Sequence, residues 1–231
     1  MSEINLIYFD TIPSTNTYAK ENINTLSLPS LIIANGQTAG RGRQGKSFYS
    51  PNDTGLYMTL LFEAPQNCSL LTPLAAVSVC EVLSEYQISP KIKWVNDIFL
   101  DNKKICGILT ECFSYNNKLY IALGIGINIT TSEFPADLDI AGSAKIICDK
   151  KLLALQISNR ILEHINCSDN QYIINEYRKH LFVIGKRISY FKNNTEYTAT
   201  VTDINEQCNL IVSREDGSTD ILSSGEISIK F

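Results

Sequence analysis

The segment from residue 40 to residue 47 carries the residue types best suited to hold an anion. It reads Gly-Arg-Gly-Arg-Gln-Gly-Lys-Ser, so Arg41, Arg43 and Lys46 place three cations within six residues of a chain whose net charge is −4. An arginine guanidinium can bind a carboxylate or a phosphate through two parallel hydrogen bonds, and glycine lets the backbone approach a ligand closely. We therefore predict an anion-binding loop here, against the alternative of a flexible, solvated loop.

The same segment matches two phosphate-binding patterns that its context does not support. Residues 40–45 match G-x-G-x-x-G, and residues 40–47 match the P-loop pattern G-x-x-x-x-G-K-[ST]. Both patterns require a helix that opens at their end, because its N-terminus holds the phosphates. Residues 46–53 are turn formers instead, and the H-R-D and D-F-G elements of protein kinases do not occur. A dinucleotide site and a kinase are thereby disfavoured, and a P-loop stays a minor alternative.

Other segments place polar and charged groups next to predicted strands. Residues 93–97 (Lys-Trp-Val-Asn-Asp) and 103–109 (Lys-Lys-Ile-Cys-Gly-Ile-Leu) flank one predicted hairpin. This hairpin brings a carboxylate and a cation onto neighbouring strands. Residues 124–128 (Gly-Ile-Gly-Ile-Asn) end the following strand, and residues 14–17 (Ser-Thr-Asn-Thr) can cap a short helix.

Taken together, these segments resemble the biotin protein ligase family. The resemblance rests on residues 14–16, 37–45, 93–97, 104–107 and 124–128, which occur in the family's order. It runs from about Phe9 to Asn128, and the tail that ends at residues 225–228 resembles the family's small SH3-like C-terminal domain. Only 13 residues precede Ser14, so we expect the short form without an N-terminal DNA-binding domain.

The resemblance implies an ATP-dependent biotin–[acetyl-CoA-carboxylase] ligase. ATP would activate biotin to biotinyl-5′-AMP with release of pyrophosphate, and biotin would then pass to one lysine of the biotin carboxyl carrier domain of a carboxylase. The first step brings a carboxylate against a phosphate, so the site needs fixed cations between them and Mg²⁺ on the departing pyrophosphate. Two alternatives stay open: a lipoate–protein ligase with the same adenylation chemistry, and a non-catalytic biotin-sensing regulator.

The resemblance also supplies the candidate site residues. For catalysis it indicates Arg43 and Lys104, which would neutralise the two anions, and Asp97, which would contact the adenylate or metal or help to deprotonate the incoming lysine. Contacts to biotin are expected from Ser14, Thr15, Asn16, Gln37, Gly40, Arg41, Arg43, Lys104, Gly107, Gly124 and Gly126. Contacts to ATP or the adenylate are expected from Arg43, Lys46, Phe48, Asn96, Asp97, Lys104 and Asn128. No metal ligand is assigned.

Three positions depart from the family pattern. Val95 stands where the family usually has a proline, which would fix the backbone angle before Asn96 and Asp97. Lys46 and Phe48 stand where bacterial relatives often carry arginine and tryptophan. Unlike the arginine guanidinium, the lysine ammonium is a point charge that cannot bind an anion through two parallel hydrogen bonds. Phenylalanine, like tryptophan, can still stack on adenine. We expect these differences to tune the activity modestly.

Positioning these residues requires an α+β fold. Short apolar runs predict strands at residues 6–9, 31–34 and 56–62 and an antiparallel meander over residues 91–129, with hairpin tips at residues 101–102 and 116–117. Capping residues and apolar spacing predict helices at residues 14–22, 70–86, 151–165 and 170–182, and residues 35–53 a long loop. By resemblance, this is a mixed, largely antiparallel sheet backed by helices, as in class II synthetase-like biotin/lipoate ligases. The switch to short strands near residue 185 predicts an SH3-like β-barrel, dividing the chain into a catalytic domain (1–183) and a C-terminal domain (184–231).

Composition favours a globular protein of the cytoplasm. The 231 residues are 44% hydrophobic and 19% charged, which argues against disorder, and their mild acidity argues against non-specific nucleic-acid binding. The apolar stretches are too short to span a bilayer, and the N-terminus lacks the features of a secretion signal. Seven scattered cysteines without a C-x-x-C pair favour free thiols. We expect no nucleic-acid or membrane partner, and a monomer or a homodimer.

Overall fold

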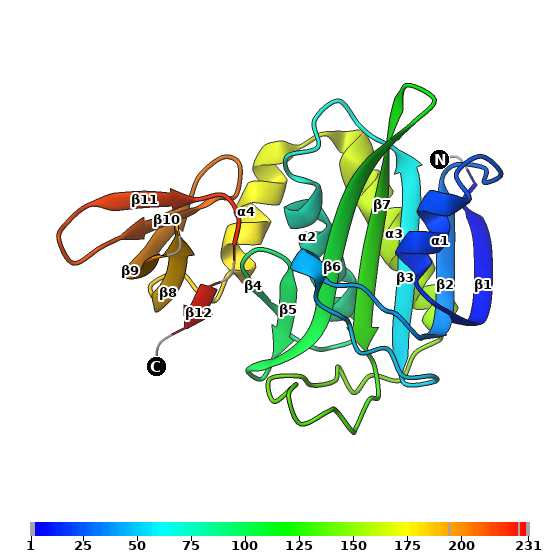
Figure 1. Ribbon diagram of the computed structural model, residues 1–231, viewed down its shortest axis with the longest axis horizontal. Helices are drawn as coiled ribbons and strands as arrows, with labels where there is room; N and C mark the ends of the chain where they lie inside the picture. Colours follow the sequence, from blue (N-terminus) through cyan, green and yellow to red (C-terminus); the bar gives the residue numbers. More distant parts are fainter. Residues whose placement is uncertain (1–2, 194, 226, 230–231) are drawn as a thin grey trace.

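One seven-stranded sheet forms the frame of the larger of two units (Figure 1), in a computed structural model that describes residues 3–193, 195–225 and 227–229. The strand order is β1-β2-β3-β7-β6-β5-β4. The strands are β1 (Asn5–Ile12), β2 (Ser30–Gln37), β3 (Gly55–Glu63), β4 (Lys91–Lys93), β5 (Asp97–Leu100), β6 (Lys103–Tyr115) and β7 (Lys118–Asn128). The pair β1–β2 is parallel and the other neighbouring pairs are antiparallel. The expected mixed, largely antiparallel sheet is therefore confirmed.

Helices pack on both faces of this sheet. The helices α2 (Leu71–Glu85) and α3 (Lys150–Cys167) cover one face, α4 (Asn170–His180) packs against α2 and β4, and α1 (Thr15–Glu21) lies on the opposite face. Successive strand residues point to opposite faces, so Ile33 and Leu60 join the large core under α2 and α3, while Ile32 and Leu61 join the small core under α1. Because α1 is short, it leaves most of its face to the loop that follows β2. None of the described helices is both long and apolar enough to cross a bilayer.

The two predicted hairpin tips are confirmed, whereas the ends of the early strands differ from the prediction. Asp101-Asn102 and Asn116-Asn117 each connect paired strands, and all four residues have positive φ, which two-residue primed turns require. In contrast, β2 continues past Ala34 to Gln37, because β1 also continues and pairs Ile12 with Gln37. The apolar residues of β2 end at Ala34, but its hydrogen bonds with β1 continue to Gln37. The predicted loop at residues 35–53 therefore began too early.

A single carboxylate ties the three helices of the covered face together. Glu81 on α2 accepts hydrogen bonds from Arg160 (2.7 Å) and Tyr172 (2.7 Å), and the His164 ring nitrogen lies 3.0 Å from it. Burial raises the pKa of Glu81, but the hydrogen bonds from Arg160, His164 and Tyr172 outweigh burial, so the pKa lies below its usual value. The carboxylate therefore stays charged and holds α3 and the start of α4 against α2.

The smaller, C-terminal unit is a five-stranded antiparallel sheet in the order β11-β10-β9-β8-β12. Its strands are β8 (Arg187–Lys192), β9 (Thr195–Ile204), β10 (Leu210–Ser213), β11 (Thr219–Leu222) and β12 (Ile227–Ile229). The sequence analysis expects a small barrel; in the described residues β11 and β12 are the two edge strands of this sheet. Glu226, in the tail that resembles the family's C-terminal domain, lies outside the described residues.

Side chains of the larger unit reach the smaller one directly behind residues 93–97. The Trp94 indole N–H donates to the carbonyl oxygen of Cys208 at 2.9 Å, and Arg178 Nε donates to Asp203 at 2.7 Å. The buried Tyr177 hydroxyl on α4 donates to the Val95 carbonyl oxygen at 2.8 Å. Trp94 is thus part of the core. The turn before Asn96 and Asp97 is braced both by α4 and by the C-terminal unit.

Candidate active site

A cavity of about 410 Å³ opens on the face of the sheet that carries α1. The segment between β2 and β3 crosses this face over β6 and β7 (Figure 1), and it forms one wall of the cavity. The other walls come from the start of α1, the turn before β5, strands β6 and β7, the loop after β7, and residues Gly225, Ile227 and Ser228 of the C-terminal unit. The segments that the sequence analysis singled out therefore meet in one place.

One end of the cavity is lined mainly by neutral polar groups, since the charge of Arg41 there is paired with that of Glu111. Ser14 caps α1 by accepting from Thr17 N–H, which leaves Thr15 and Asn16 on the first turn, both buried. The backbone N–H of Thr15 donates to Gln37 Oε1 at 2.9 Å, and Gln37 Nε2 donates to Ser50 Oγ at 3.0 Å. Such hydroxyl and carboxamide groups can both donate and accept, as a neutral polar ring requires.

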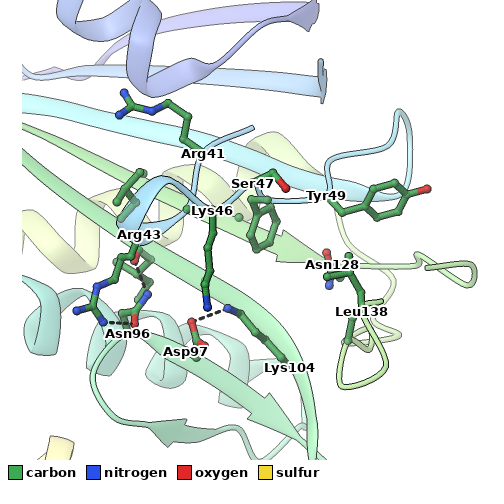
Figure 2. A pocket seen from close by; sticks show the side chains of 18 of the residues that line it. Arg41, Arg43, Lys46, Ser47, Tyr49, Asn96, Asp97, Lys104, Asn128 and Leu138 are labelled. Carbon is green, nitrogen blue, oxygen red and sulfur yellow. Dashed lines mark hydrogen bonds and ion pairs between the residues drawn. The ribbon is translucent and has the colours of Figure 1, made fainter. Parts of the chain in front are cut away.

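The other end is cationic, and Figure 2 shows its ion pair. Lys104 Nζ on β6 lies 2.7 Å from Asp97 Oδ1 on β5, so the predicted pairing of a cation and a carboxylate across this hairpin is confirmed. Arg43 Nη1 donates to Asn96 Oδ1 at 2.9 Å, and Asn96 Nδ2 donates to the Ile108 carbonyl at 2.8 Å. Two cations, Arg43 and Lys104, are thus held by consecutive residues, Asn96 and Asp97, and such a pair of cations suits the approach of two anionic groups.

The glycine loop divides its cations between the two ends. The short 3₁₀ turn at Arg43–Gly45 turns the chain so that Arg43 and Lys46 point towards Asn96 and Asp97, whereas Arg41 points away from them (Figure 2). Arg41 instead pairs with Glu111, at 3.2 Å from Nη2 to Oε1. The three cations that look alike in the sequence therefore do not form one patch.

The glycines of the cavity make room for the protein's own groups. A Cβ on Gly126 would lie 2.5 Å from the Phe48 ring, and one on Gly107 would lie 3.1 Å from it. A Cβ on Gly124 would lie 2.3 Å from Asn16 Oδ1, and one on Gly40 would lie 2.5 Å from the Phe48 carbonyl oxygen. Contacts below 3.0 Å essentially do not occur at a real Cβ, and one of 3.1 Å is unusually tight, so these glycines allow Phe48 and Asn16 to pack against the sheet.

Several lining residues had no signal in the sequence analysis. Phe134 and Leu138 come from the loop after β7, and the Phe134 ring lies 6.2 Å from that of Tyr49 across the rim. The loop after β7 lacks apolar periodicity, so only its length between β7 and α3 could have drawn attention to it. Asn128, which was predicted, donates to the Gly142 carbonyl oxygen at 2.9 Å, but its buried Oδ1 has no partner among the described residues. A buried acceptor of this kind at the cavity wall indicates a ligand that donates to it.

The fold thus places a pocket of neutral polar groups beside a cationic one, and comparison with known proteins gives the family. A model of the Biotin/lipoate A/B protein ligase family matches residues 8–128, which is more than half of the chain, and a model of the Biotin protein ligase C terminal domain matches residues 183–230. The chain therefore belongs to the biotin/lipoate A/B protein ligase family.

Individual relatives agree with this assignment. The chain is 35% identical over 186 residues to the bifunctional ligase/repressor BirA of Bacillus subtilis, a match that covers 77% of this chain and 56% of that protein. It is 25% identical over 214 residues to the biotin–[acetyl-CoA-carboxylase] ligase of Mycobacterium tuberculosis. The structure of the biotin protein ligase from Aquifex aeolicus in complex with biotin and ATP superposes with a TM-score of 0.83 at 26% identity, over 98% of both chains. The chain thus spans little more than half of its Bacillus relative and nearly all of the Aquifex chain.

Proposed function

We propose that this protein is a biotin protein ligase, which joins biotin and ATP to form biotinyl-5′-AMP and pyrophosphate and then transfers biotin to a lysine of a carrier domain. The observation that carries the proposal is the division of one cavity into an end lined mainly by neutral polar groups, with Thr15 and Gln37, and a cationic end, with Arg43 and Lys104. Family membership and the superposition on a ligase that holds biotin and ATP support it.

In the first step, a carboxylate oxygen of biotin attacks the α-phosphorus of ATP and pyrophosphate leaves with the electrons of the broken P–O bond. Arg43 and Lys104 would lie between the two anions and offset their repulsion, and their own partners, Asn96 and Asp97, hold them in place before the substrates arrive. Cations that are already oriented need not reorganise during the reaction, which is why such groups stabilise transition states strongly. We propose that Asn128 Oδ1, which is buried and has no partner among the described residues, accepts a hydrogen bond from the adenylate.

In the second step, the amine of the carrier lysine attacks the acyl carbon of biotinyl-5′-AMP, and AMP leaves. A lysine is mostly an ammonium ion at neutral pH, so it must lose a proton before it attacks. We propose that Asp97 contacts the adenylate and receives this proton when Lys104 moves its ion pair to the phosphate.

Magnesium is expected with the nucleotide rather than in a preformed protein site. Within residues 3–193, 195–225 and 227–229, no group of three His, Cys, Asp or Glu side chains is arranged to hold an ion. Mg²⁺ is commonly held by one or two carboxylates together with the phosphates of a substrate, and Asp97 is the carboxylate that fits this description at the cationic end. Bound there, Mg²⁺ would neutralise charge on the departing pyrophosphate.

We further propose the division of labour along the chain and the setting of the reaction. Residues 1–183 would bind biotin and ATP, and residues 184–231 would brace the turn at residues 93–97 and close one side of the cavity. The carrier partner is a biotin carboxyl carrier domain of a carboxylase, which fits the name of the Mycobacterium relative. Because both ATP and such carriers belong to the cytoplasm, we place the reaction there.

The test is ATP–pyrophosphate exchange with either biotin or lipoate as the acid, followed by mass measurement of a carrier domain incubated with the protein, biotin, ATP and Mg²⁺. We expect exchange with biotin and one biotinyl group on one carrier lysine. Lys104→Met should lower both signals about 100-fold, and the matched control Lys118→Met, at an exposed pair with Glu63, should retain them. Exchange with lipoate alone would refute the proposal in favour of a lipoate ligase, and exchange with neither acid would refute both.

A further inference from the structure

Glu111 on β6 joins its own strand to α1 and to the glycine loop at the polar end of the cavity. Its Oε1 accepts from Lys20 Nζ on α1 at 2.8 Å and lies 3.2 Å from Arg41 Nη2 of the glycine loop. Its Oε2 accepts from Asn16 Nδ2 at 2.9 Å and from Arg41 Nη1 at 3.4 Å. The side chain is only 19% exposed. No motif includes Glu111, and its partners Asn16 and Arg41 lie 95 and 70 residues away in the sequence.

The Glu111 side chain is ionised at neutral pH. Burial raises its pKa, but the hydrogen bonds from Lys20 and Asn16 and the charges of Lys20 and Arg41 outweigh burial, so the pKa lies below its usual value. An ionised carboxylate has no proton to donate and can only accept hydrogen bonds. Every group that faces Glu111 must therefore present a donor.

This constraint sets the direction of a chain of hydrogen bonds behind the polar wall. Asn16 must turn its Nδ2 to Glu111, which leaves Asn16 Oδ1 to accept from the Thr59 hydroxyl at 2.6 Å. The Thr59 and Thr15 hydroxyl oxygens lie 2.8 Å apart, and the Thr15 hydroxyl donates to Gln37 Oε1 at 3.2 Å. Gln37 Oε1 also accepts the backbone N–H of Thr15 at 2.9 Å. With a neutral amide at position 111, only two long hydrogen bonds from Nδ2, to the Leu109 carbonyl oxygen at 3.5 Å and the Ala122 carbonyl oxygen at 3.4 Å, would still favour this orientation of Asn16.

Glu111 also fastens one side of the glycine loop. Arg41 faces it with both terminal nitrogens, in the forked arrangement that a guanidinium makes with a carboxylate. Phe48, seven residues later, rests on Gly107 and Gly126 of the sheet. The loop is thus held at two points, by an ion pair at the polar end and by an aromatic ring in the middle.

We infer that Glu111 is a positioning residue for biotin: its negative charge orients the donors and acceptors of the wall that meets the ureido ring, and it latches the glycine loop through Arg41. The inference rests on the proposed function, because it names biotin as the ligand that this wall binds. Glu111 need not touch biotin itself, since it is not among the described residues that line the cavity, whereas its partner Asn16 is.

The kinetic test is Glu111→Gln, which keeps the size of the side chain and removes its charge. In pyrophosphate exchange we expect the KM for biotin to rise about 10-fold, because the hydrogen bonds of the polar wall lose their fixed directions. The cationic end is not changed, so kcat and the KM for ATP should change less than about twofold. Lys20→Gln is the matched control: it removes another partner of the same carboxylate but leaves Asn16 and Arg41 in place, so the KM for biotin should stay within about twofold. An unchanged KM for biotin in Glu111→Gln, or an equal rise in both KM values, would overturn the inference, as would an equal rise in Lys20→Gln.

A second measurement needs neither substrate. Trypsin cleaves after Arg43 and Lys46 only when the loop opens, so Glu111→Gln and Arg41→Gln should both be cut there about threefold faster than wild type, and Lys20→Gln at the wild-type rate. Equal cleavage rates in all four proteins would show that the ion pair between Glu111 and Arg41 does not hold the loop. If wild type shows no exchange with biotin, the proposed function fails, while the cleavage rates still decide whether Glu111 holds the loop.

Discussion

Replacing Tyr177 with phenylalanine tests whether α4 positions the turn that carries Asn96 and Asp97. The Tyr177 side chain is fully buried, and its hydroxyl donates to the Val95 carbonyl oxygen at 2.8 Å. Tyr177→Phe removes this one donor and keeps the ring, so no cavity forms. A hydrogen bond contributes about 0.5–1.5 kcal/mol net, and a half-buried carbonyl left without a donor adds to the loss. We therefore expect the free energy of unfolding to fall by about 1.5 kcal/mol.

Thermal unfolding measures this loss. In a protein of this size, about 1 kcal/mol corresponds to a shift of about 2–4 °C in Tm, so Tyr177→Phe should lower Tm by about 3–6 °C. The matched control is Tyr115→Phe at the exposed end of β6, which should change the stability by less than about 0.5 kcal/mol. A Tm for Tyr177→Phe equal to that of Tyr115→Phe would refute the reasoning.

The same variant has an expected effect on the reaction. Asn96 holds Arg43, and Asp97 pairs with Lys104, so a shift of this turn should disturb the cationic end and leave the polar end intact. We expect the KM for ATP to rise about threefold to tenfold and the KM for biotin to stay within about twofold. Equal kinetic constants in wild type and Tyr177→Phe would show that the turn keeps its place without the Val95 hydrogen bond.

Three further outcomes follow from the site and the helices. Lys104→Met should lower the kcat of exchange about 100-fold, because it removes a charge between the two anions, whereas Lys118→Met should leave kcat unchanged; similar losses in both would contradict the assignment. Gly126→Ala should raise the KM for ATP about 10-fold, since the new methyl group would lie 2.5 Å from the Phe48 ring, and adding Phe48→Ala should cause no further rise; independent, additive effects would argue against this contact. Glu81 has a pKa below its ordinary 4.5, so its stabilising effect is present above pH 4.5 and is lost as the pH falls through the lowered pKa. The difference in unfolding free energy between wild type and Glu81→Gln should therefore shrink on acidification, and a difference that stays constant in urea titrations down to about pH 3 would contradict this linkage.

Features that depend on neighbouring residues could be predicted from the sequence. The tips at Asp101-Asn102 and Asn116-Asn117 follow from residues that tolerate positive φ, and the cap of α1 follows from Ser14. The pairing of Lys104 with Asp97 could be predicted because both residues flank one hairpin, whose geometry is local. The full extent of β2 could not, because its last pairs depend on a partner strand that is separated from it by α1.

In the candidate site, too, contacts between residues far apart in the chain could not be predicted from the sequence. Thr59 and Glu111 look like ordinary strand residues, and their contacts with Asn16 join positions 43 and 95 residues apart, so no spacing along the chain indicates them. Phe134 and Leu138 lie in a loop without periodicity and reach the cavity only because the loop folds back over its rim. Long-range contacts of this kind arise when the sheet and α1 pack together, which local patterns do not encode.

The order of residues along the chain is enough to specify the chemical groups available to the site, the hairpin that carries two of them, and an α+β architecture with a separate strand-rich tail. Which end of the cavity each group faces depends on how the chain packs. Arg41 and Arg43 are two residues apart and chemically identical, yet one pairs with Glu111 and the other with Asn96. The physical reason is that a charged side chain goes to the partner that its backbone can reach, and the path of this backbone is set by Phe48 resting on glycines of two strands far along the chain.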